Sequence, residues 1–312
     1  MGDSSESLVL GLGYLPTPPD VTKKLAGIKL VKEPAVLPKH VDFSGDMKPP
    51  KYQNGWASCV PFGLLGALDS ATLPDTYSEA YNWYKTKQLH GFDPHGNSGV
   101  NVHVAISVMQ KQGTCWESSC VYPTDPDHRY PKYDWPEPSD AANKEALKHK
   151  IADARFLIKP VDKDAVRMLL AAKTPVVIGF SMFGDPTYWK KWIWSDECLT
   201  SGVVPMPPEP VPDPTDGHCV SLVGYDDDKK LFKFKNSWGR ERGKDGWFWM
   251  PYEYFEKVDQ QGNPYITDAI VFTPGQEQPA IPSLRAMAET VAPDAIWKHF
   301  AFTDGEQPSG LV

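Results

Sequence analysis

The sequence predicts an α+β protein with a mainly helical first half and a second half built from strands. Apolar residues recur at helical spacing within residues 59–71, 77–91 and 100–113. From about residue 155 the chain consists of short runs rich in Val, Ile, Phe and Trp, which are typical of strands. The 312 residues are enough for one large domain or two smaller ones that share an interface.

The first 38 residues predict an extended arm that packs on the body of the protein. They contain "PTPP" and two later prolines, and few helix signals. They lack a basic stretch followed by a continuous apolar run, and no 18-residue apolar run occurs in the chain. We therefore expect no membrane span, and a cytoplasmic protein or one delivered by a route that needs no such signal.

Residues 39–150 predict the helical subdomain. The run "CVPFGLLGALDSA" places Cys59 at a helix N-terminus, with Pro61 in the first turn where proline is tolerated. The segments 77–91 and 100–113 end at Gly91 and Gly113, which are helix stop signals.

Residues 151–273 predict a mostly antiparallel sheet or barrel. The strand-like runs are "FLIKPV", "PVVIGF", "CVSLVGY", "LFKFKNSW" and "GWFWM", and one short helix is expected near "DKDAVRMLLAAK". Six prolines between Pro205 and Pro214 form a stiff segment that is either a linker or a wall beside a site. The remaining residues, 274–312, predict a C-terminal tail with one amphipathic helix near "LRAMAETVAPDAIWKHF".

The composition excludes several kinds of partner. The net charge is −8 and no Lys/Arg cluster is longer than a pair, so nucleic acid is not expected. The five cysteines are an odd number without metal-site spacing, so we expect reduced thiols, no metal and no cofactor. A Cys115 to Cys120 link is sterically conceivable, but structural thiols are favoured. A monomer is favoured, although the sequence does not determine the oligomeric state.

Cys59 is the cysteine placed best for nucleophilic chemistry, because a helix N-terminus favours the thiolate. Acyl transfer by a thiolate also needs a base, a group that orients the base, and donors for the oxyanion. The segment "TDGHCVSLVGYDDDKKLFKFKNSWG" places His218 at the start of one strand-like run and Asn236 at the end of the next. Two adjacent strands would bring these side chains together.

These motifs resemble the papain family of cysteine peptidases, in particular its bacterial branch. The resemblance rests on "GYLPTPPD", "GHCVSLVGYDDD", "NSWG" and "GWFWMPYEY", which occur in the family's order within a match from about residue 11 to 272. It implies the papain-like two-subdomain fold: a helical left subdomain with the nucleophile helix, an antiparallel β-barrel-like right subdomain, and an active site in the cleft between them. It also implies a peptide or protein as substrate.

The resemblance further implies a role for each matched residue. Cys59 would be the nucleophile, His218 the general base and later acid, and Asn236 the group that holds the imidazole. The side chain of Gln53 and the backbone N–H of Cys59 would donate to the oxyanion. The residues implied in substrate binding are Ser98 and Gly99, which would pair with an extended peptide, and Trp238, which would shield the Asn to His hydrogen bond.

The sequence departs from the family pattern next to the nucleophile and after "NSWG". Asn54 and Ala57 replace two expected glycines, Val60 replaces a tryptophan, and Arg242-Gly243 stands where a second Trp-Gly is usual. None of these is a reacting group. Asn54 and Ala57 test whether the turn keeps its shape, and Asn54 is the milder change because Asn tolerates positive φ better than most residues.

Three functions remain open from the sequence. The first is a peptidase that forms and hydrolyses a thioester on Cys59. The second is acyl transfer or ligation by the same site, and the third is a catalytically silent papain-like peptide-binding module.

Overall fold

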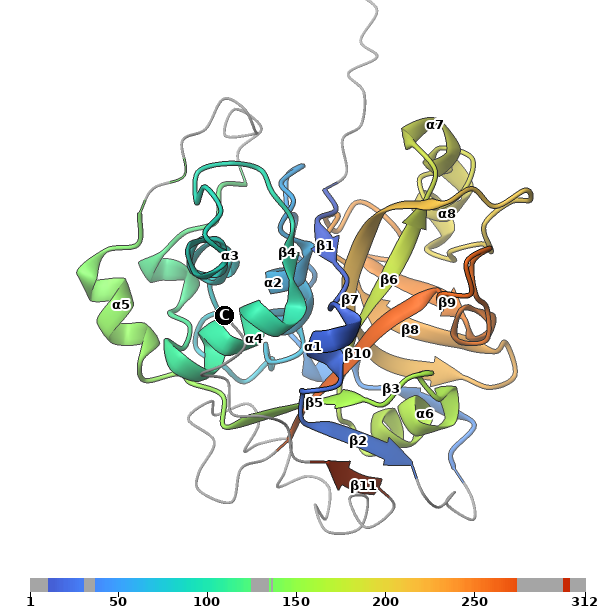
Figure 1. Cartoon of the computed structure of the whole chain (residues 1–312), viewed down its shortest axis with the longest axis horizontal. Helices are drawn as coiled ribbons and strands as arrows, with labels where there is room; N and C mark the ends of the chain where they lie inside the picture. The colour runs from blue at the N-terminus through green and yellow to red at the C-terminus, as the bar shows by residue number, and fades with distance from the viewer. Residues whose placement is uncertain (1–10, 31–36, 125–134, 136, 274–299, 304–312) are drawn as a thin grey trace, which may run out of the picture.

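The computed structural model describes residues 11–30, 37–124, 135, 137–273 and 300–303. The helices within residues 59–146 gather on one side of the molecule, and the large sheet lies on the other side with the helices of residues 163–201, as the left and right of Figure 1 show. Residues 14–22 of the N-terminal arm run between these two parts. The α+β architecture expected from the sequence is therefore present.

The helices of the first half follow the apolar periodicity of the sequence. Helix α2 begins at Cys59, and α3 begins after Ser78, whose side chain accepts a hydrogen bond from the backbone N–H of Tyr81 at 3.0 Å. The helical segments are α1 (Pro19–Thr22), η1 (Ser44–Asp46), α2 (Cys59–Gly66), α3 (Glu79–His90), α4 (Val102–Lys111), η2 (Glu117–Ser119), α5 (Asp140–Ala146), α6 (Lys163–Ala171), α7 (Pro186–Trp189), α8 (Asp196–Ser201) and η4 (Tyr252–Phe255).

The strands of the second half form one large, mainly antiparallel sheet. Its strand order is β11-β2-β5-β10-β6-β7-β8-β9, with β3 paired to β7, and only the β2–β5 pair is parallel. The strands of this sheet are β2 (Gly27–Leu30), β3 (His40–Asp42), β5 (Asp153–Leu157), β6 (Val176–Phe183), β7 (Pro214–Asp226), β8 (Leu231–Lys235), β9 (Trp247–Pro251), β10 (Ile266–Thr273) and β11 (Phe300–Thr303).

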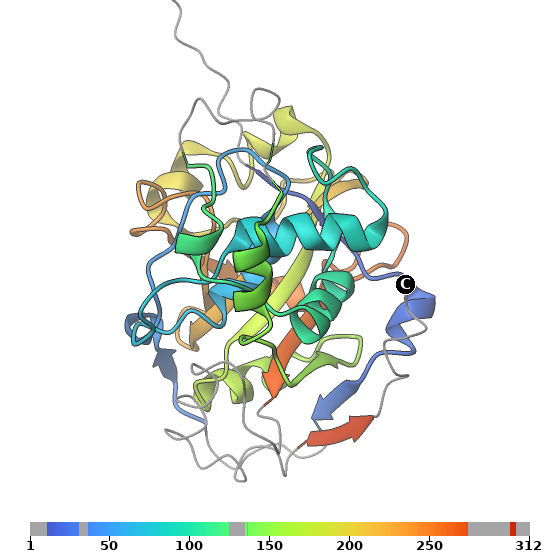
Figure 2. The same ribbon diagram turned by 90° about the vertical axis from the view of Figure 1, so that its left-hand side faces the viewer.

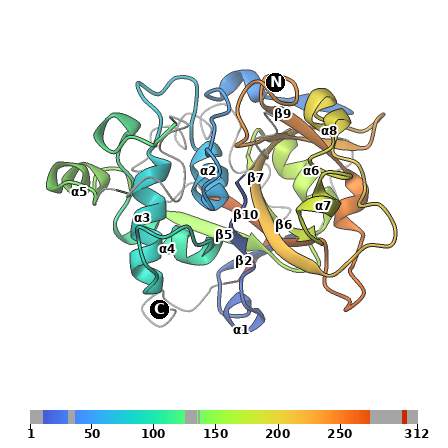
Figure 3. The same ribbon diagram turned by 90° about the horizontal axis from the view of Figure 1, so that it is seen from above.

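Helix α2 packs directly against β7, and this contact joins the two halves. Figure 3 shows α2 between the other helices and the sheet. One hydrophobic core lies on the sheet side and includes Trp238, and the other lies on the helical side and includes Cys59. Residues at the start of α2 and on β7 therefore meet where the two cores adjoin.

The arm contributes strands to both parts. Strand β1 (Tyr14–Leu15) pairs in parallel with β4 (Val100–Asn101), in a small sheet of their own. Strand β2 then inserts between β5 and β11 of the large sheet. Figure 2 shows β2 beside β11, so a segment near the N-terminus is held by one near the C-terminus.

Two features differ from the sequence expectation. The second half has two further short helices, α7 and α8, in a tryptophan-rich segment that carries no helical apolar period. Their starts are stabilised by the side chains of Asp185 and Ser195, which accept hydrogen bonds from backbone N–H groups. The helix expected near residues 284–300 lies almost wholly outside the described residues. Within the described part of the chain, no helix has the length and apolar character needed to cross a membrane.

Candidate active site

Cys59 lies at the first position of α2, with its side chain fully buried. Cys59 belongs to the same buried cluster as Cys219 of β7. Cys219 directly follows His218 on β7. The packing of α2 on β7 thus brings the sulfur of Cys59 next to the segment that carries His218.

His218 and Asn236 are brought together by the pairing of β7 with β8. The Nε2 atom of His218 lies 2.9 Å from Oδ1 of Asn236. The indole of Trp238 stacks on the imidazole, with ring centroids 4.9 Å apart and an interplanar angle of 18°. Within the described residues, Nδ1 of His218 has no hydrogen-bond partner, so this nitrogen is the one left to exchange a proton.

Gln53 and the backbone N–H of Cys59 converge on one oxygen atom. The Nε2 atom of Gln53 donates to the carbonyl oxygen of Leu12 at 3.2 Å, and the N–H of Cys59 donates to the same oxygen at 3.4 Å. Gln53 also donates to the carbonyl of Trp56 at 2.6 Å. A carbonyl oxygen of the arm therefore occupies the position between the two donors.

The backbone of the arm lies along the wall formed by Ser98 to Val100. The N–H of Val100 donates to the carbonyl of Gly13 at 2.9 Å, and the N–H of Gly13 donates to the carbonyl of Gly217 at 3.3 Å. A Cβ atom on Gly99 would lie 2.4 Å from the carbonyl oxygen of Gly13, so only glycine permits this approach. The arm is thus bound as an added strand.

Ser98 and Trp238 also lie beside this path. The carbonyl of Ser98 accepts a hydrogen bond from the indole of Trp83 at 3.3 Å, which fixes the wall to α3. The indole N–H of Trp238 donates to the carbonyl of Gly11 at 3.1 Å. Trp238 therefore contacts both the imidazole and the arm.

Burial shifts the pKa values of Cys59 and His218 so that the neutral form of each side chain is favoured. Desolvation raises the pKa of the Cys59 thiol well above its ordinary value. Desolvation also lowers the pKa of His218 to about 4, against a smaller opposing effect of the bond to Asn236. With the arm in place, the site favours a thiol and a neutral imidazole over a thiolate and imidazolium pair.

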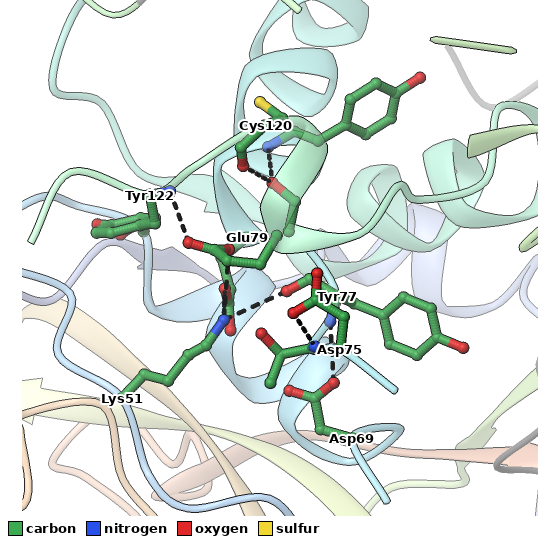
Figure 4. A network of polar contacts seen from close by, with 12 residues as sticks. Lys51, Asp69, Asp75, Tyr77, Glu79, Cys120 and Tyr122 are labelled. Atoms are coloured by element: carbon green, nitrogen blue, oxygen red, sulfur yellow. Dashed lines mark hydrogen bonds and ion pairs between the residues drawn. The ribbon is translucent and has the colours of Figure 1, made fainter. Parts of the chain in front are cut away.

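A buried polar network supports the loop that carries Gln53. The hydroxyl of Tyr122 donates to the backbone carbonyl of Gln53 at 2.7 Å and lies 2.7 Å from the hydroxyl of Ser58, the residue before Cys59. The N–H of Tyr122 donates to Glu117, and Lys51 forms an ion pair with Glu79 at 2.5 Å (Figure 4). The network ties the start of α2 and the Gln53 loop to the start of α3.

The replaced glycines near the nucleophile are accommodated in this loop. Asn54 has a positive φ of 52°, which Asn tolerates better than most residues, and its side chain donates to the carbonyl of Pro123 at 3.2 Å. The N–H of Ala57 donates to Asn97 at 2.6 Å. Arg242 donates to the carbonyl of Trp238 at 2.6 Å.

Sequence reasoning did not find Leu12, Tyr14 and Tyr122 as residues of the site. In the sequence, Gly11 and Gly13 were the features that could have indicated the role of the arm. Without side chains, they leave the backbone on either side of Leu12 open to close contacts. Tyr122 carries no motif of its own, and only the folded chain places its hydroxyl against Gln53.

The chain is similar to known cysteine proteases. A family model described as papain family cysteine protease matches residues 37–264. The uncharacterized peptidase C1-like protein L477 of Acanthamoeba polyphaga mimivirus is 26% identical over 268 residues, which are 78% of this chain and 81% of the viral protein.

Solved structures give the same assignment. The structure of xylellain, a cysteine protease from Xylella fastidiosa, has a TM-score of 0.68 and 27% identity, and covers 84% of this chain and 96% of xylellain. Procathepsin L2 from the larval midgut of Tenebrio molitor has a TM-score of 0.59, with 84% of this chain and 78% of that one covered, and at 21% identity it shows the fold alone. With the family model matching well over half of its length, the chain belongs to the papain family of cysteine proteases.

Proposed function

We propose that the protein hydrolyses peptide bonds through a thioester on Cys59. The observation that supports this most directly is the convergence of the Gln53 side chain and the Cys59 N–H on a single carbonyl oxygen. Two donors aimed at one carbonyl, beside a thiol at a helix N-terminus, are what acyl transfer requires.

In the proposed mechanism the substrate carbonyl takes the place of the Leu12 carbonyl. His218 accepts the thiol proton at Nδ1 as the sulfur of Cys59 attacks the carbonyl carbon, and Asn236 holds the imidazole through Nε2. The tetrahedral oxyanion receives the N–H groups of Gln53 and Cys59. His218 then protonates the leaving amine, which gives the thioester, and activates a water that releases the acid and restores the thiol.

The arm must leave before a substrate can bind. Its carbonyl of Leu12 fills the oxyanion position, and its backbone occupies the wall at Gly99. We propose that the described state is a closed one, in which the protein's own residues 11–15 block the site.

The test is product analysis by mass spectrometry after incubation with a peptide library, for the full chain, for Tyr14→Gly to loosen the arm, and for Cys59→Ala in the Tyr14→Gly background. We expect hydrolysis products from Tyr14→Gly, fewer from the full chain, and none when Cys59 is replaced. An added amine acceptor separates the alternatives: amide products in place of acids would indicate ligation, and a folded Tyr14→Gly variant without products would indicate a silent binding module.

A further inference from the structure

The side chain of Tyr14 fills a pocket beside the proposed active site. Tyr14 is 1% exposed and belongs to the hydrophobic core on the helical side. It stands two residues after Leu12, whose carbonyl lies between the oxyanion donors. An extended chain spans about 3.3–3.6 Å per residue, so a peptide bound at those donors reaches this pocket within two residues.

Two glycines make the pocket wide enough for an aromatic ring. A Cβ atom on Gly179 would lie 2.2 Å from the ring of Tyr14, and one on Gly217 would lie 2.5 Å from it. These residues are on the paired strands β6 and β7, and Gly217 directly precedes His218. Any other residue at either position would take the space of the ring.

The floor of the pocket accepts a hydrogen bond. The hydroxyl of Tyr14 donates to Oδ2 of Asp268 at 2.5 Å and lies 2.7 Å from Oγ1 of Thr267. Asp268 is fully buried on β10. Oδ2 also accepts a hydrogen bond from the N–H of Thr17 at 3.0 Å, and this donor leaves with the arm when a substrate takes its place. The loss of a donor to a buried carboxylate is costly.

The charge of this floor is balanced within the protein. Lys159 forms an ion pair with Oδ1 of Asp268 at 3.2 Å. Because the ion pair carries no net charge, it does not attract a cationic side chain. Oδ2 can still accept a hydrogen bond from an uncharged donor. An uncharged ring with a hydroxyl at its tip fits both the walls and the floor.

We propose that this pocket selects tyrosine in a peptide substrate, because buried Asp268 accepts a hydrogen bond from the hydroxyl at the tip of the ring. This inference rests on the proposed function, because it assumes that substrates bind where the arm lies. Tyr14 then acts as an internal copy of the preferred substrate side chain. A cavity of about 900 Å³ adjoins the pocket along Tyr14, Asp216 and Thr267, and gives room for the flanking peptide.

The experiment measures protection of Cys59 from iodoacetamide in the full-length Tyr14→Gly variant, with mass mapping of the alkylated residue. The competitors are the peptides acetyl-Gly-Xaa-Gly-Gly-amide with Xaa as Tyr, Phe, Arg or Leu. We expect the Tyr peptide to halve the alkylation rate at a concentration about tenfold or more below that of the Phe peptide, since one hydrogen bond to a carboxylate distinguishes them. Adding Asp268→Leu should reduce this ratio to about one.

Because Asp268 is buried, a second substitution keeps the test independent of its effect on folding. Gly179→Ala should abolish protection by both the Tyr and the Phe peptide, whereas Gly45→Ala, where a Cβ would meet nothing within 4 Å, should leave protection unchanged. Equal protection by Tyr and Phe, better protection by Arg, or no protection by Tyr at millimolar concentration would overturn the inference. Because binding is measured, a protein that is protected by Tyr but cleaves nothing would contradict the proposed hydrolysis and still support the pocket.

Discussion

Gln53 is the residue whose contacts define the oxyanion position most directly. Its amide nitrogen donates to Leu12, and its amide oxygen accepts a hydrogen bond from Ser237 at 2.5 Å, so the orientation of the amide is fixed from both ends. We expect Gln53→Ala in the Tyr14→Gly background to lower kcat by ~10²- to 10³-fold with little change in KM, because the lost donor acts in the transition state. Steady-state kinetics would check this, and an equal loss in Lys51→Met would instead indicate a general disturbance of the loop.

The pKa of His218 determines how the stability of the closed state changes with pH. Its pKa is lowered to about 4 by burial, and in an open, hydrated site it would return toward its ordinary value of about 6.5. The open state therefore binds more protons between these values. The contribution of neutral His218 to the stability of the closed state is therefore fully present above about pH 6.5. It is lost as the pH falls toward about 4.

Hydrogen exchange of residues 11–15 at pH 7 and pH 5, corrected for intrinsic rates, would measure this opening. We expect opening to increase at pH 5 by at most about 30-fold, which follows from the two pKa values. Burial raises the pKa of Asp216, so protonation of this carboxylate stabilises the closed state as the pH falls and opposes the effect of His218. His218→Gln isolates the imidazole, and an unchanged pH dependence in that variant would refute its role.

At the residue scale the motifs predicted the elements that carry the candidate residues. A helix begins at Cys59, and the pairing of β7 with β8 brings His218 and Asn236 together, while the catalytic roles of these residues stay predictions. Asp268 could not be found in this way, because its significance depends on a strand register that brings it under Tyr14.

The N-terminal arm is the element that decides access to the site. Gly13 has a φ of 112°, and a Cβ atom there would lie 2.2 Å from the carbonyl oxygen of Ala57. We therefore expect Gly13→Ala to displace the arm and raise the rate of Cys59 alkylation by about tenfold or more, given strain of at least the 1–3 kcal/mol typical of such positions. Leu15→Ala, on a half-exposed side chain of the same strand, is the matched control and should leave the rate unchanged.

The proline-rich segment from Pro205 to Pro214 is the other element beside the site. It is fixed by side chains from outside it: Tyr188 donates to the carbonyl of Pro208 at 2.5 Å, and Gln260 donates to the carbonyl of Val211 at 2.9 Å. Pro214 lines the cavity next to Tyr14. We expect replacement of residues 205–213 by a Gly-Ser linker to broaden the set of peptides cleaved, and an identical cleavage profile would show that the segment is no wall.

At the scale of the whole molecule, a strand near the N-terminus pairs with one near the C-terminus at one edge of the sheet. Strand β11 pairs with β2 over four residue pairs, and β2 continues the arm that enters the cleft. Truncation at Pro274 removes β11 and should loosen the arm, so we expect faster alkylation of Cys59 than in the full chain. Equal rates would show that the tail does not hold the arm.

The two-part fold could be predicted because helical and strand periodicities divide the chain near its middle. The pairing of β11 with β2 could not, since it joins residues about 270 positions apart and has no local signal. The path of the arm through the cleft depends on the same kind of long-range contact.

Intact-mass analysis after treatment with an epoxide-based inhibitor of papain-like proteases tests most directly whether Cys59 and His218 form an activated pair. It should be run on the full chain, on Tyr14→Gly and on Tyr14→Gly with His218→Ala. We expect one adduct on Cys59 that forms slowly in the full chain, rapidly in Tyr14→Gly and very slowly once His218 is removed. No adduct in folded Tyr14→Gly, or equal labelling without His218, would contradict it.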